Sequence, residues 1–446
     1  MLNSFIYQNS PVFIQHIAVS CYELIKRKMR ATESSKALML TLIDHEKDKQ
    51  ALKRYHDGKI DQVLQNAVEH CPFYQKQQYK QPLQLCDFDF TTKENVRENN
   101  TQFLNVDSKE IKIEGKTSGT TGTPLSIYQD IASVRAEKAF TDRQLQWAGY
   151  VKGDKIGWMR GDMIVPFTQK KPPFWRYSYF ENMVLLSSYH MTPKALPQYI
   201  TTMVDFGVDI IQAYPSSILI LAKYLDVNDL YYQGTLKSIV TSSESLATED
   251  KALIEKRFKC PVFDWYGLFE RVAAIASCEH GNYHILTDYS HVELIDQGDG
   301  YHEIVGTNFN NSLFPLIRYK TGDFVKLSTE KQCACGRVFP MVDHIKGRVG
   351  DYLIAEDGQK MHILNHIPKG IAGLIATQFT QYSHKEINAL VVVEDTLFLA
   401  PQRLQLIQNA QDRLGKSIEV KVEVVNSIPK TKNGKSRQAI CTIKED

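Results

Sequence analysis

The sequence has almost no net charge and no long apolar run. Lys and Arg number 53 against 51 Asp and Glu, a formal charge of +2. The sequence therefore has no excess of positive charge that would favour nucleic acid as a partner. No run of about 18 apolar residues is present, which argues against a membrane-spanning helix. The N-terminus lacks a signal-peptide pattern, and most of the 8 cysteines are scattered. We therefore expect a cytoplasmic protein with reduced thiols.

The patterned part of the chain alternates between strand and helix signals. With 446 residues, of which 43% are hydrophobic, the chain is long enough for two or three domains. Short apolar strands are expected at 156–159, 208–213 and 238–242, with helices at 197–205 and 216–225. This alternation predicts an α/β fold built in layers.

The two ends of the chain follow other patterns. Residues 36–69 keep a helical pattern that Pro72 stops, which makes 1–75 a helical region. Near the C-terminus, strands at 389–393 and 418–425 flank a helix at 401–414. Glycines between 347 and 351 mark the boundary. We predict a large multi-layer α/β domain over 1–348 and a small α+β domain over 349–446.

The N-terminal segment from Ser4 to Met29 has apolar residues at near-helical spacing and ends in the basic run of Lys26, Arg27, Lys28 and Arg30. One interpretation is an amphipathic helix on an anionic membrane surface. The other is a helix packed on its own domain with a solvated basic end. The second is favoured, because amphipathic helices usually face a core.

The segment Lys116–Pro124 reads KTSGTTGTP and is rich in hydroxyls and glycines. Glycines let backbone N–H groups approach an anion, and hydroxyls add donors. The segment is not a Walker loop, because no Gly-Lys-Ser/Thr ends it. Composition alone leaves two interpretations open, a phosphate-binding loop or a flexible polar loop.

Five motifs occur in the order found in one enzyme superfamily. They are TSGTTGTPL at 117–125, YGLFE at 266–270, YKTGD at 319–323, GRVGD at 347–351 and PKTKNGKSR at 429–437. Together they resemble the adenylate-forming superfamily of acyl-CoA ligases, luciferases and peptide-synthetase adenylation domains. SSYHM at 187–191, QAYPS at 212–216 and CACGR at 333–337 are similar to the phenylacetate–CoA ligase branch. SPVFIQ at 10–15 is similar to CapK-like proteins of capsular polysaccharide biosynthesis.

The resemblance implies roles for particular residues. Lys435 and Glu270 would be catalytic, with Glu270 holding Mg²⁺ and Lys435 facing the developing negative charge. The expected nucleotide-binding residues are Thr117, Ser118, Gly119, Thr120, Thr121 and Gly122 for the triphosphate, Ser243, Glu244 and Tyr266 around the adenine, Asp323 at the ribose hydroxyls and Arg348 near the ribose and phosphate. His190, Tyr214 and Ser216 would line the acyl pocket. One departure is Phe269, which stands where threonine is usual.

A second group of residues has the chemistry of a structural zinc site. Cys333 and Cys335 form a Cys-x-Cys pair, and Cys278 is followed by two histidines, His280 and His284. Zinc takes four Cys or His ligands in a closed structural site. The resemblance favours Cys278, His284, Cys333 and Cys335, with His280 as the other candidate for the histidine ligand. The alternative is free buried thiols and surface histidines.

The implied function is ATP-dependent activation of a carboxylate to an acyl-adenylate, with release of pyrophosphate. The acyl group then passes to a thiol such as CoA or to an amine, in surface or capsular polysaccharide biosynthesis. The substrate would be a small carboxylic acid or a sugar-linked carboxylate. The C-terminal domain would rotate about Gly350 between the two half-reactions, because Lys435 must leave before the acceptor enters.

Two other functions stay open. One is a CoA ligase of an aryl or other small acid. The other is a non-catalytic nucleotide-binding scaffold in a membrane-associated assembly complex, peripheral to the inner membrane through the N-terminal segment. Phe269 favours the scaffold, whereas Glu270, Asp323 and Lys435 argue against it because a scaffold does not need them.

Overall fold

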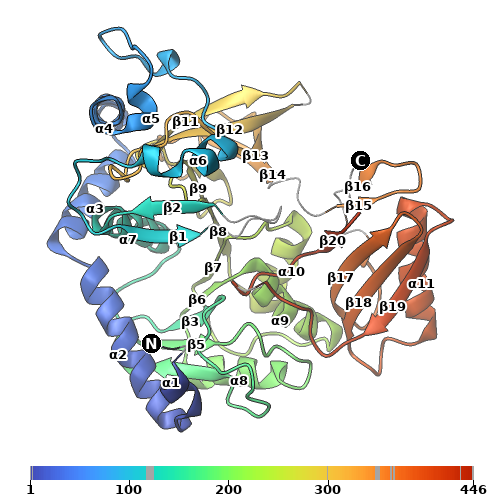
Figure 1. The fold of residues 1–446 in the computed structure, drawn as a ribbon. Coiled ribbons are helices and arrows are strands. Elements are labelled where there is room, and N and C mark those ends of the chain that lie inside the picture. Colours follow the sequence, from blue (N-terminus) through green and yellow to red (C-terminus); the bar gives the residue numbers. More distant parts are fainter. Residues whose placement is uncertain are drawn as a thin grey trace. The chain divides into compact units, whose positions relative to one another are not determined.

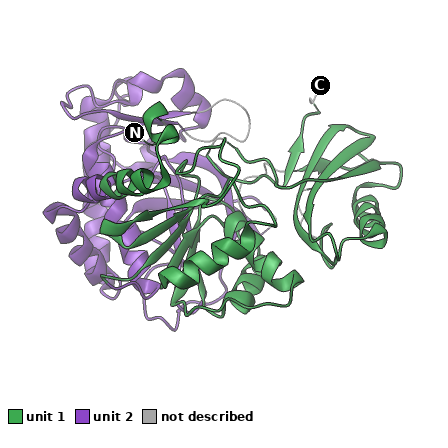
Figure 2. Cartoon of the chain, turned by 90° about the horizontal axis from the view of Figure 1, so that it is seen from below, with its two compact units in different colours: residues 1–23, 152–262, 349–446 green, residues 24–151, 263–348 purple. Residues whose placement is uncertain are grey.

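The computed structural model describes residues 2, 4–116, 125–298, 300–346, 352–361, 364, 367–431 and 433–443. Contacts divide the chain into two compact units, shown in green and purple in Figure 2. Unit 1 consists of residues 1–23, 152–262 and 349–446, and unit 2 of residues 24–151 and 263–348. One unit boundary falls between residues 348 and 349. The division into a large domain over 1–348 and a mobile one over 349–446 stays a prediction.

Unit 1 contains a mostly parallel sheet with the strand order β7-β6-β3-β5-β4 (Figure 1). Its strands are β3 (Ile156–Met159), β4 (Trp175–Ser178), β5 (Met183–Leu186), β6 (Ile210–Ala213) and β7 (Ser238–Ser242). The helices that alternate with them are α8 (Leu196–Phe206), α9 (Pro215–Val227) and α10 (Thr248–Phe258), and η3 (Tyr179–Glu181) is a single short turn. Only β4 at the edge is antiparallel. The predicted α/β alternation is confirmed, with the strand expected at 208–213 shortened to 210–213.

The C-terminal part of unit 1 is an α+β layer with its own core. Its sheet order is β19-β18-β17-β20, and α11 contributes Leu406, Ala410 and Leu414 to the buried cluster. The elements are β15 (Leu353–Ile354), β16 (Lys360–Met361), β17 (Leu374–Ser383), β18 (Glu386–Val393), α11 (Ala400–Leu414), β19 (Glu419–Val424) and β20 (Ala439–Cys441). The predicted small α+β unit is confirmed.

The chain begins with α1 (Phe5–Asn9), which belongs to unit 1, and α2 (Val12–Arg30), which starts in unit 1 and continues into unit 2 after residue 23. One side of this segment packs on its own unit, because Tyr7 and Val19 belong to the core of unit 1. The Tyr7 hydroxyl also donates a hydrogen bond to the Ile164 carbonyl at 2.6 Å. Other apolar side chains of the same helices, among them Phe5 and Phe13, are exposed. No helix in the described part of the chain combines the length and apolar character needed to cross a bilayer.

Unit 2 combines helices with an antiparallel sheet in the order β11-β12-β13-β14-β10-β9-β8. Its strands are β1 (Ile113–Lys116), β2 (Ser126–Gln129), β8 (Val262–Gly267), β9 (Ala274–Ser277), β10 (Tyr283–Ile285), β11 (Ser290–Asp296), β12 (Tyr301–Asn308), β13 (Tyr319–Leu327) and β14 (Met341–Lys346). The helices are α3 (Glu33–His45), α4 (Lys49–His70), α5 (Pro72–Gln75), α6 (Lys93–Glu98) and α7 (Ile131–Trp147), with short turns η1 (Leu85–Asp87) and η2 (Asn100–Phe103).

The helical stretch expected at 36–69 is two helices. The first helix, α3, ends at His45. Asp48 then caps the start of α4 by accepting hydrogen bonds from the backbone N–H groups of Gln50 and Ala51. An aspartate in this cap position satisfies amide donors that have no partner within the helix. Pro72 ends the pattern as predicted, but it also starts α5, where a proline at the first position costs no hydrogen bond.

Candidate active site and metal cluster

Two of the predicted nucleotide motifs lie outside the described residues. These are the loop with Thr117, Ser118, Gly119, Thr120, Thr121 and Gly122, and the segment 347–351 with Arg348. Their roles stay predictions. The strands that flank the first loop are described, and β1 pairs antiparallel with β2 so that Lys116 lies opposite Ser126. The described residues Lys116 and Ser126, on either side of this segment, are therefore held next to each other.

In unit 2, Asp323 and Tyr266 form a hydrogen-bonded pair. Asp323 lies on β13 and Tyr266 on β8, and the Tyr266 hydroxyl donates to Asp323 Oδ2 at 2.8 Å. The backbone N–H of Asp323 donates to Thr321 Oγ1 at 3.0 Å. Asp323 is only 3% exposed. Two residues predicted for nucleotide binding are thus brought together, and the carboxylate is fixed in direction.

Glu270 follows β8 and is buried, with an exposed fraction of 1%. The Tyr319 hydroxyl donates to Glu270 Oε1 at 3.2 Å, and the Glu270 carbonyl accepts from Asn308 Nδ2 at 3.3 Å. A buried carboxylate needs partners for its charge. Glu270 therefore has the oxygen chemistry and the fixed position that a Mg²⁺ ligand requires.

Phe269, the departure from the expected motif, packs against the strand that leads into the predicted phosphate loop. A Cβ atom placed on Gly115 would lie 2.0 Å from Phe269 Cζ. The Phe269 carbonyl also accepts from Gln129 Nε2 at 2.9 Å. The ring therefore occupies the space that a Cβ at residue 115 would take, and it packs against the β1–β2 pair.

In unit 1, Glu244 joins two segments through backbone hydrogen bonds. Its Oε2 accepts from the N–H of Ser216 at 2.9 Å, and its Oε1 accepts from the N–H of Ser436 at 2.9 Å. The preceding residue, Ser243, has a φ of +72°. A serine in this left-handed region is uncommon, and such conformations concentrate at functional sites. The predicted contact of Ser243 and Glu244 with adenine stays a prediction.

Two of the three predicted acyl-pocket residues lie at the start of α9. The Tyr214 hydroxyl donates to the Asn433 carbonyl at 3.2 Å, and Ser216 Oγ is buried without a hydrogen-bond partner among the described residues. His190 bonds neither of them in that part of the chain. Its Nδ1 lies 2.8 Å from Ser187 Oγ and its ring stacks on Phe174. Burial lowers the pKa of His190, so its ring is neutral at neutral pH.

Lys435 lies on a tight hairpin packed against other segments of unit 1. Thr431 and Lys435 are joined by an N–H to carbonyl hydrogen bond of 2.9 Å, and Gly434 has a φ of +74°. A Cβ atom on Gly161 would lie 1.8 Å from the Asn433 carbonyl oxygen. The glycine at 161 is therefore required for the hairpin to approach. Together with the Tyr214 and Glu244 contacts, this brings the Lys435 hairpin to the predicted acyl-binding segment.

Arg160, at the end of β3, was missed by the motif comparison. Its Nη2 donates to Ser242 Oγ at 2.5 Å and to Ser243 Oγ at 2.9 Å. The guanidinium also lies over the rings of Trp158 and Tyr214, at 5.2 and 5.3 Å from their centroids. The signal in the sequence is a charged residue directly after an apolar strand of a parallel sheet, where ligands commonly bind.

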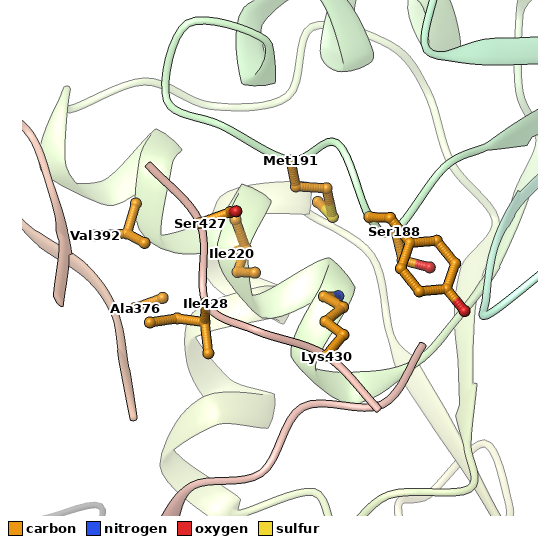
Figure 3. A pocket seen from close by; sticks show the side chains of 9 residues that line it. Ser188, Met191, Ile220, Ala376, Val392, Ser427, Ile428 and Lys430 are labelled. Carbon is orange, nitrogen blue, oxygen red and sulfur yellow. The ribbon is translucent and has the colours of Figure 1, made fainter. Parts of the chain in front are cut away.

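A pocket in unit 1 lies next to the hairpin (Figure 3). Its lining residues come from the parallel-sheet part and the C-terminal part, and they are Ser188, Tyr189, Met191, Ile220, Ala376, Val392, Ser427, Ile428 and Lys430. Lys430 Nζ lies 3.4 Å from Ser217 Oγ. Burial lowers the pKa of Lys430 to about 8, which the nearby Glu244 partly opposes. The pocket is mostly apolar around this one amine.

The four predicted metal ligands converge in unit 2. The ligand atoms of Cys278, His284, Cys333 and Cys335 all lie within 4.8 Å of one another. Cys278 Sγ and Cys333 Sγ are 3.6 Å apart, and Cys335 Sγ is 3.5 Å from His284 Nε2. Tetrahedral zinc with ordinary bond lengths requires about 3.8 Å and about 3.5 Å for these pairs. His280 is exposed and is not part of the cluster.

The surroundings of the cluster also suit zinc. His284 Nδ1 lies 3.4 Å from the Phe339 carbonyl, which leaves Nε2 directed at the sulfurs. Asn282 Nδ2 and the backbone N–H of Arg337 donate to Cys333 Sγ and Cys335 Sγ. Such outer contacts orient metal ligands and favour thiolates. The residues therefore fit a closed zinc site, and the binding of a metal there stays a prediction.

The chain is similar in sequence to several known proteins. The CapK C-terminal domain family matches residues 353–442. Protein CapK of Staphylococcus aureus is 26% identical over the whole of both chains. Phenylacetate-coenzyme A ligase of Pseudomonas putida is 26% identical over 68% of this chain and 72% of its own. The sequence likeness therefore extends beyond the five motifs.

Solved structures show the same fold. A crystal structure of 2-hydroxyisobutyryl-CoA ligase in the postadenylation state, in complex with R3-HIB-AMP, has a TM-score of 0.64 at 18% identity and covers 89% of this chain and 90% of its own. An open conformation of that ligase with 2-HIB-AMP and CoA gives a TM-score of 0.51 at 20% identity, over 88% and 91% of the two chains. The chain is therefore similar along its whole length to Protein CapK, over about two thirds of its length to phenylacetate-CoA ligases, and in fold to an acyl-CoA ligase.

Proposed function

We propose that the chain is an ATP-dependent, AMP-forming ligase that activates a carboxylic acid as its acyl-adenylate. The observation that carries the proposal is the position of the Lys435 hairpin, which is hydrogen-bonded to Tyr214 and Glu244. A lysine beside an acyl-binding segment can stabilise negative charge that develops as the carboxylate attacks the α-phosphate. The phenylacetate-CoA ligase relatives support the same chemistry.

Particular side chains would prepare ATP for this attack. Asp323, with its direction set by Tyr266, would accept hydrogen bonds from the two ribose hydroxyls. Glu270 would supply a carboxylate oxygen to Mg²⁺, which neutralises phosphate charge when bound. Lys435 would act on the transition state, so it is expected to affect the rate more than ATP affinity.

The acid and the acceptor are narrower proposals. We infer a small carboxylic acid or a sugar-linked carboxylate, because the predicted acyl-pocket residues Tyr214, Ser216 and His190 are polar. The acceptor would be the thiol of CoA or an amine. The resemblance to CapK-like proteins of capsular polysaccharide biosynthesis favours a role in surface or capsular polysaccharide biosynthesis over a general aryl-acid CoA ligase. The full-length likeness to Protein CapK is consistent with that resemblance.

We also propose that Cys278, His284, Cys333 and Cys335 hold one structural zinc ion. Four protein ligands leave no open position, so the site would have no catalytic role. Its function would be to link the segment around Cys333 to two strands. β9 ends directly before Cys278, and β10 carries His284.

Pyrophosphate release tests the proposed activity. The purified chain is incubated with ATP, Mg²⁺ and a panel of carboxylates that includes aryl acids, amino acids and uronic acids. We expect release with at least one acid and a loss of more than about 100-fold in Lys435→Ala with ATP affinity nearly unchanged. Asp323→Ala should instead weaken ATP binding by about 1.5–3 kcal/mol, measured by calorimetry. ATP binding without pyrophosphate release from any acid would favour the non-catalytic scaffold.

The predicted rotation of the C-terminal part needs a separate measurement. Gly350 lies outside the described residues, and Gly350→Pro would fix φ at that position. We expect this variant to form the acyl-adenylate and to lose transfer to the acceptor. Equal loss of both half-reactions in a folded variant would count against a hinge at this position.

A further inference from the structure

Arg160 is a partly buried cation in unit 1 without a carboxylate partner in the described part of the chain. Its two hydrogen bonds go to the hydroxyls of Ser242 and Ser243, and both use Nη2. A guanidinium has five N–H donors. The donors on Nε and Nη1 find no acceptor among the described residues. The aromatic rings of Trp158 and Tyr214 hold the guanidinium in place, so its orientation is set before any ligand arrives.

The acidic side chains around Arg160 are engaged elsewhere. Asp162 accepts a hydrogen bond from Trp158 Nε1 at 2.6 Å. Glu244 accepts from the backbone N–H groups of Ser216 and Ser436. Neither forms an ion pair with Arg160. The positive charge is therefore available to an anion that comes from outside the described chain.

The neighbours of Arg160 belong to the predicted acyl site. Tyr214, which lies against the guanidinium, also bonds the Lys435 hairpin. Ser216 Oγ, two residues further on, is buried and has no partner in the described segments. A preformed cation and an unused hydroxyl at this place suit a substrate with an anionic group and further polar groups.

We propose that Arg160 binds a second anionic group of the acid, distinct from the carboxylate that is activated. This inference rests on the proposed function and names the substrate class, an acid that carries an additional carboxylate or phosphate. The fork of guanidinium donors matches both groups in geometry. A sugar-linked carboxylate with a phosphate belongs to this class.

Paired substrates provide the test. Pyrophosphate release is measured with acids that differ by one anionic group, such as butyrate with succinate, glycerate with 3-phosphoglycerate, and a hexuronic acid with its 1-phosphate. The wild-type chain should prefer the dianionic member of at least one pair. Arg160→Gln, which keeps amide donors for the serine hydroxyls, should lower kcat/KM for that member about 10- to 100-fold. The monoanionic member should change less than about 3-fold.

Two control variants sharpen the test. Arg160→Lys keeps the charge but not the fork and should give an intermediate loss. Arg413→Gln removes an exposed arginine on α11 and should change neither member of the pair.

Different failures have different meanings. Equal loss for both members in Arg160→Gln would show that Arg160 only positions the Ser242–Ser243 segment and would overturn the inference. A raised KM for ATP alone would assign Arg160 to the nucleotide and overturn it too. In either case the proposed function stands. No pyrophosphate from wild type with any acid would overturn the proposed function and this inference with it.

A second, independent observation concerns the surface of α1 and α2. Phe5 and Ile6 are 81% and 80% exposed, and Phe13 and Ile17 are 64% and 55% exposed. Phe13 and Ile17 are four residues apart and therefore share a face of α2. The opposite side is anchored in the core of unit 1 through Tyr7 and Val19. The exposed apolar side chains are thus held on folded helices.

We propose that this apolar surface binds an anionic lipid bilayer. Arg27 and Lys28, which follow on the same helix, are exposed. Basic side chains next to bulky apolar ones are the combination that holds helices at the surface of anionic membranes. A second copy of the chain as the partner would not account for the basic side chains beside the apolar ones.

Vesicle flotation tests the membrane surface. The full chain should bind vesicles of phosphatidylcholine with phosphatidylglycerol more than pure phosphatidylcholine vesicles, and salt should weaken binding. Phe13→Ser with Ile17→Ser should reduce binding at least 5-fold. The matched control Leu404→Ser, an exposed leucine on α11, should not. Equal binding by all variants, or a wild-type dimer that the double substitution dissociates, would overturn the proposal.

Discussion

Two arginines in different units have similar aromatic surroundings but differ in their hydrogen-bond partners, which are a carboxylate for one and hydroxyls for the other. Arg143 in unit 2 lies over Phe140, Trp147 and Phe339 and binds both oxygens of Asp288 at 2.6 and 3.0 Å. Its side chain is 1% exposed and that of Asp288 is fully buried. Arg160 in unit 1 also lies over two rings, but within the described part of the chain its side chain bonds only the hydroxyls of Ser242 and Ser243.

The difference separates a structural arginine from one available for binding. A buried charge is tolerated when it is paired and hydrogen-bonded, and Arg143 meets this condition within the fold. Arg160 is only partly buried, so water can satisfy its remaining donors until a ligand replaces it. Arg143 is therefore neutralised within the fold, whereas Arg160, beside the predicted acyl site, has no carboxylate partner among the described residues.

The largest expected effect is loss of the metal cluster in unit 2. Purified protein should carry about one zinc per chain, and Cys333→Ser should lose it together with much of the stability of unit 2. Structural zinc contributes on the order of 10 kcal/mol to folding in small zinc domains. Metal analysis and thermal unfolding measure both effects. Cys86→Ser, at an exposed cysteine, should retain the metal. Native protein without metal would contradict the prediction.

Removal of the Arg143 partner should have the next largest effect. Asp288→Ala leaves a buried guanidinium without its carboxylate and should lower the free energy of unfolding by about 3–5 kcal/mol, measured by urea denaturation. The double variant Arg143→Met with Asp288→Leu should recover much of this loss, because neither charge remains. A single-variant loss below about 1 kcal/mol would remove the contrast with Arg160.

Acid should reduce the same contribution. Burial alone would raise the pKa of Asp288, but Arg143 and His45 outweigh it and lower the pKa below its ordinary value. A carboxylate with a lower pKa when folded stabilises the fold above its unfolded pKa, and this contribution is lost as pH falls through the folded pKa. The stability difference between wild type and Asp288→Asn should therefore be constant near pH 7 and shrink below about pH 4. A difference that grows in acid would refute the assignment.

The smallest expected effect on stability is that of Arg160. Arg160→Gln should change the free energy of unfolding by less than about 1 kcal/mol, because only two hydrogen bonds at a partly exposed site are altered. Urea denaturation provides the measurement. A loss as large as that of Asp288→Ala would show that Arg160 is structural and would end the comparison.

Much of the site could be predicted because its residues lie in short, ordered motifs. The resemblance singled out Asp323 and Glu270 through their motifs and favoured the set of Cys278, His284, Cys333 and Cys335, whose functional roles stay predictions. The choice between His280 and His284 depends on the direction of each side chain. His284 lies on β10, whose pairing with β9 and β14 carries it to the sulfurs, whereas His280 is exposed.

Other features had weaker sequence signals. The break between α3 and α4 depends on one capping aspartate, Asp48, inside an otherwise helical pattern. Phe269 departs from the expected motif, and its ring packs over Gly115, which is more than 150 residues away in the chain. Arg160 carries no motif of its own, so only its neighbours in space reveal its chemistry.

By itself, the sequence determined the alternation of strands and helices, the C-terminal α+β part and the identity of the residues that carry acid, amine and thiol chemistry. These depend on local periodicity and on side-chain type, and both follow directly from the order of the residues. The tertiary structure alone decided which of these groups have partners. It paired Arg143 with Asp288, bound Glu244 to the Lys435 hairpin and left Arg160 without a carboxylate among the described residues. The physical reason is that charge compensation depends on distance in space, and contacts between residues 145 or 192 positions apart have no local signature.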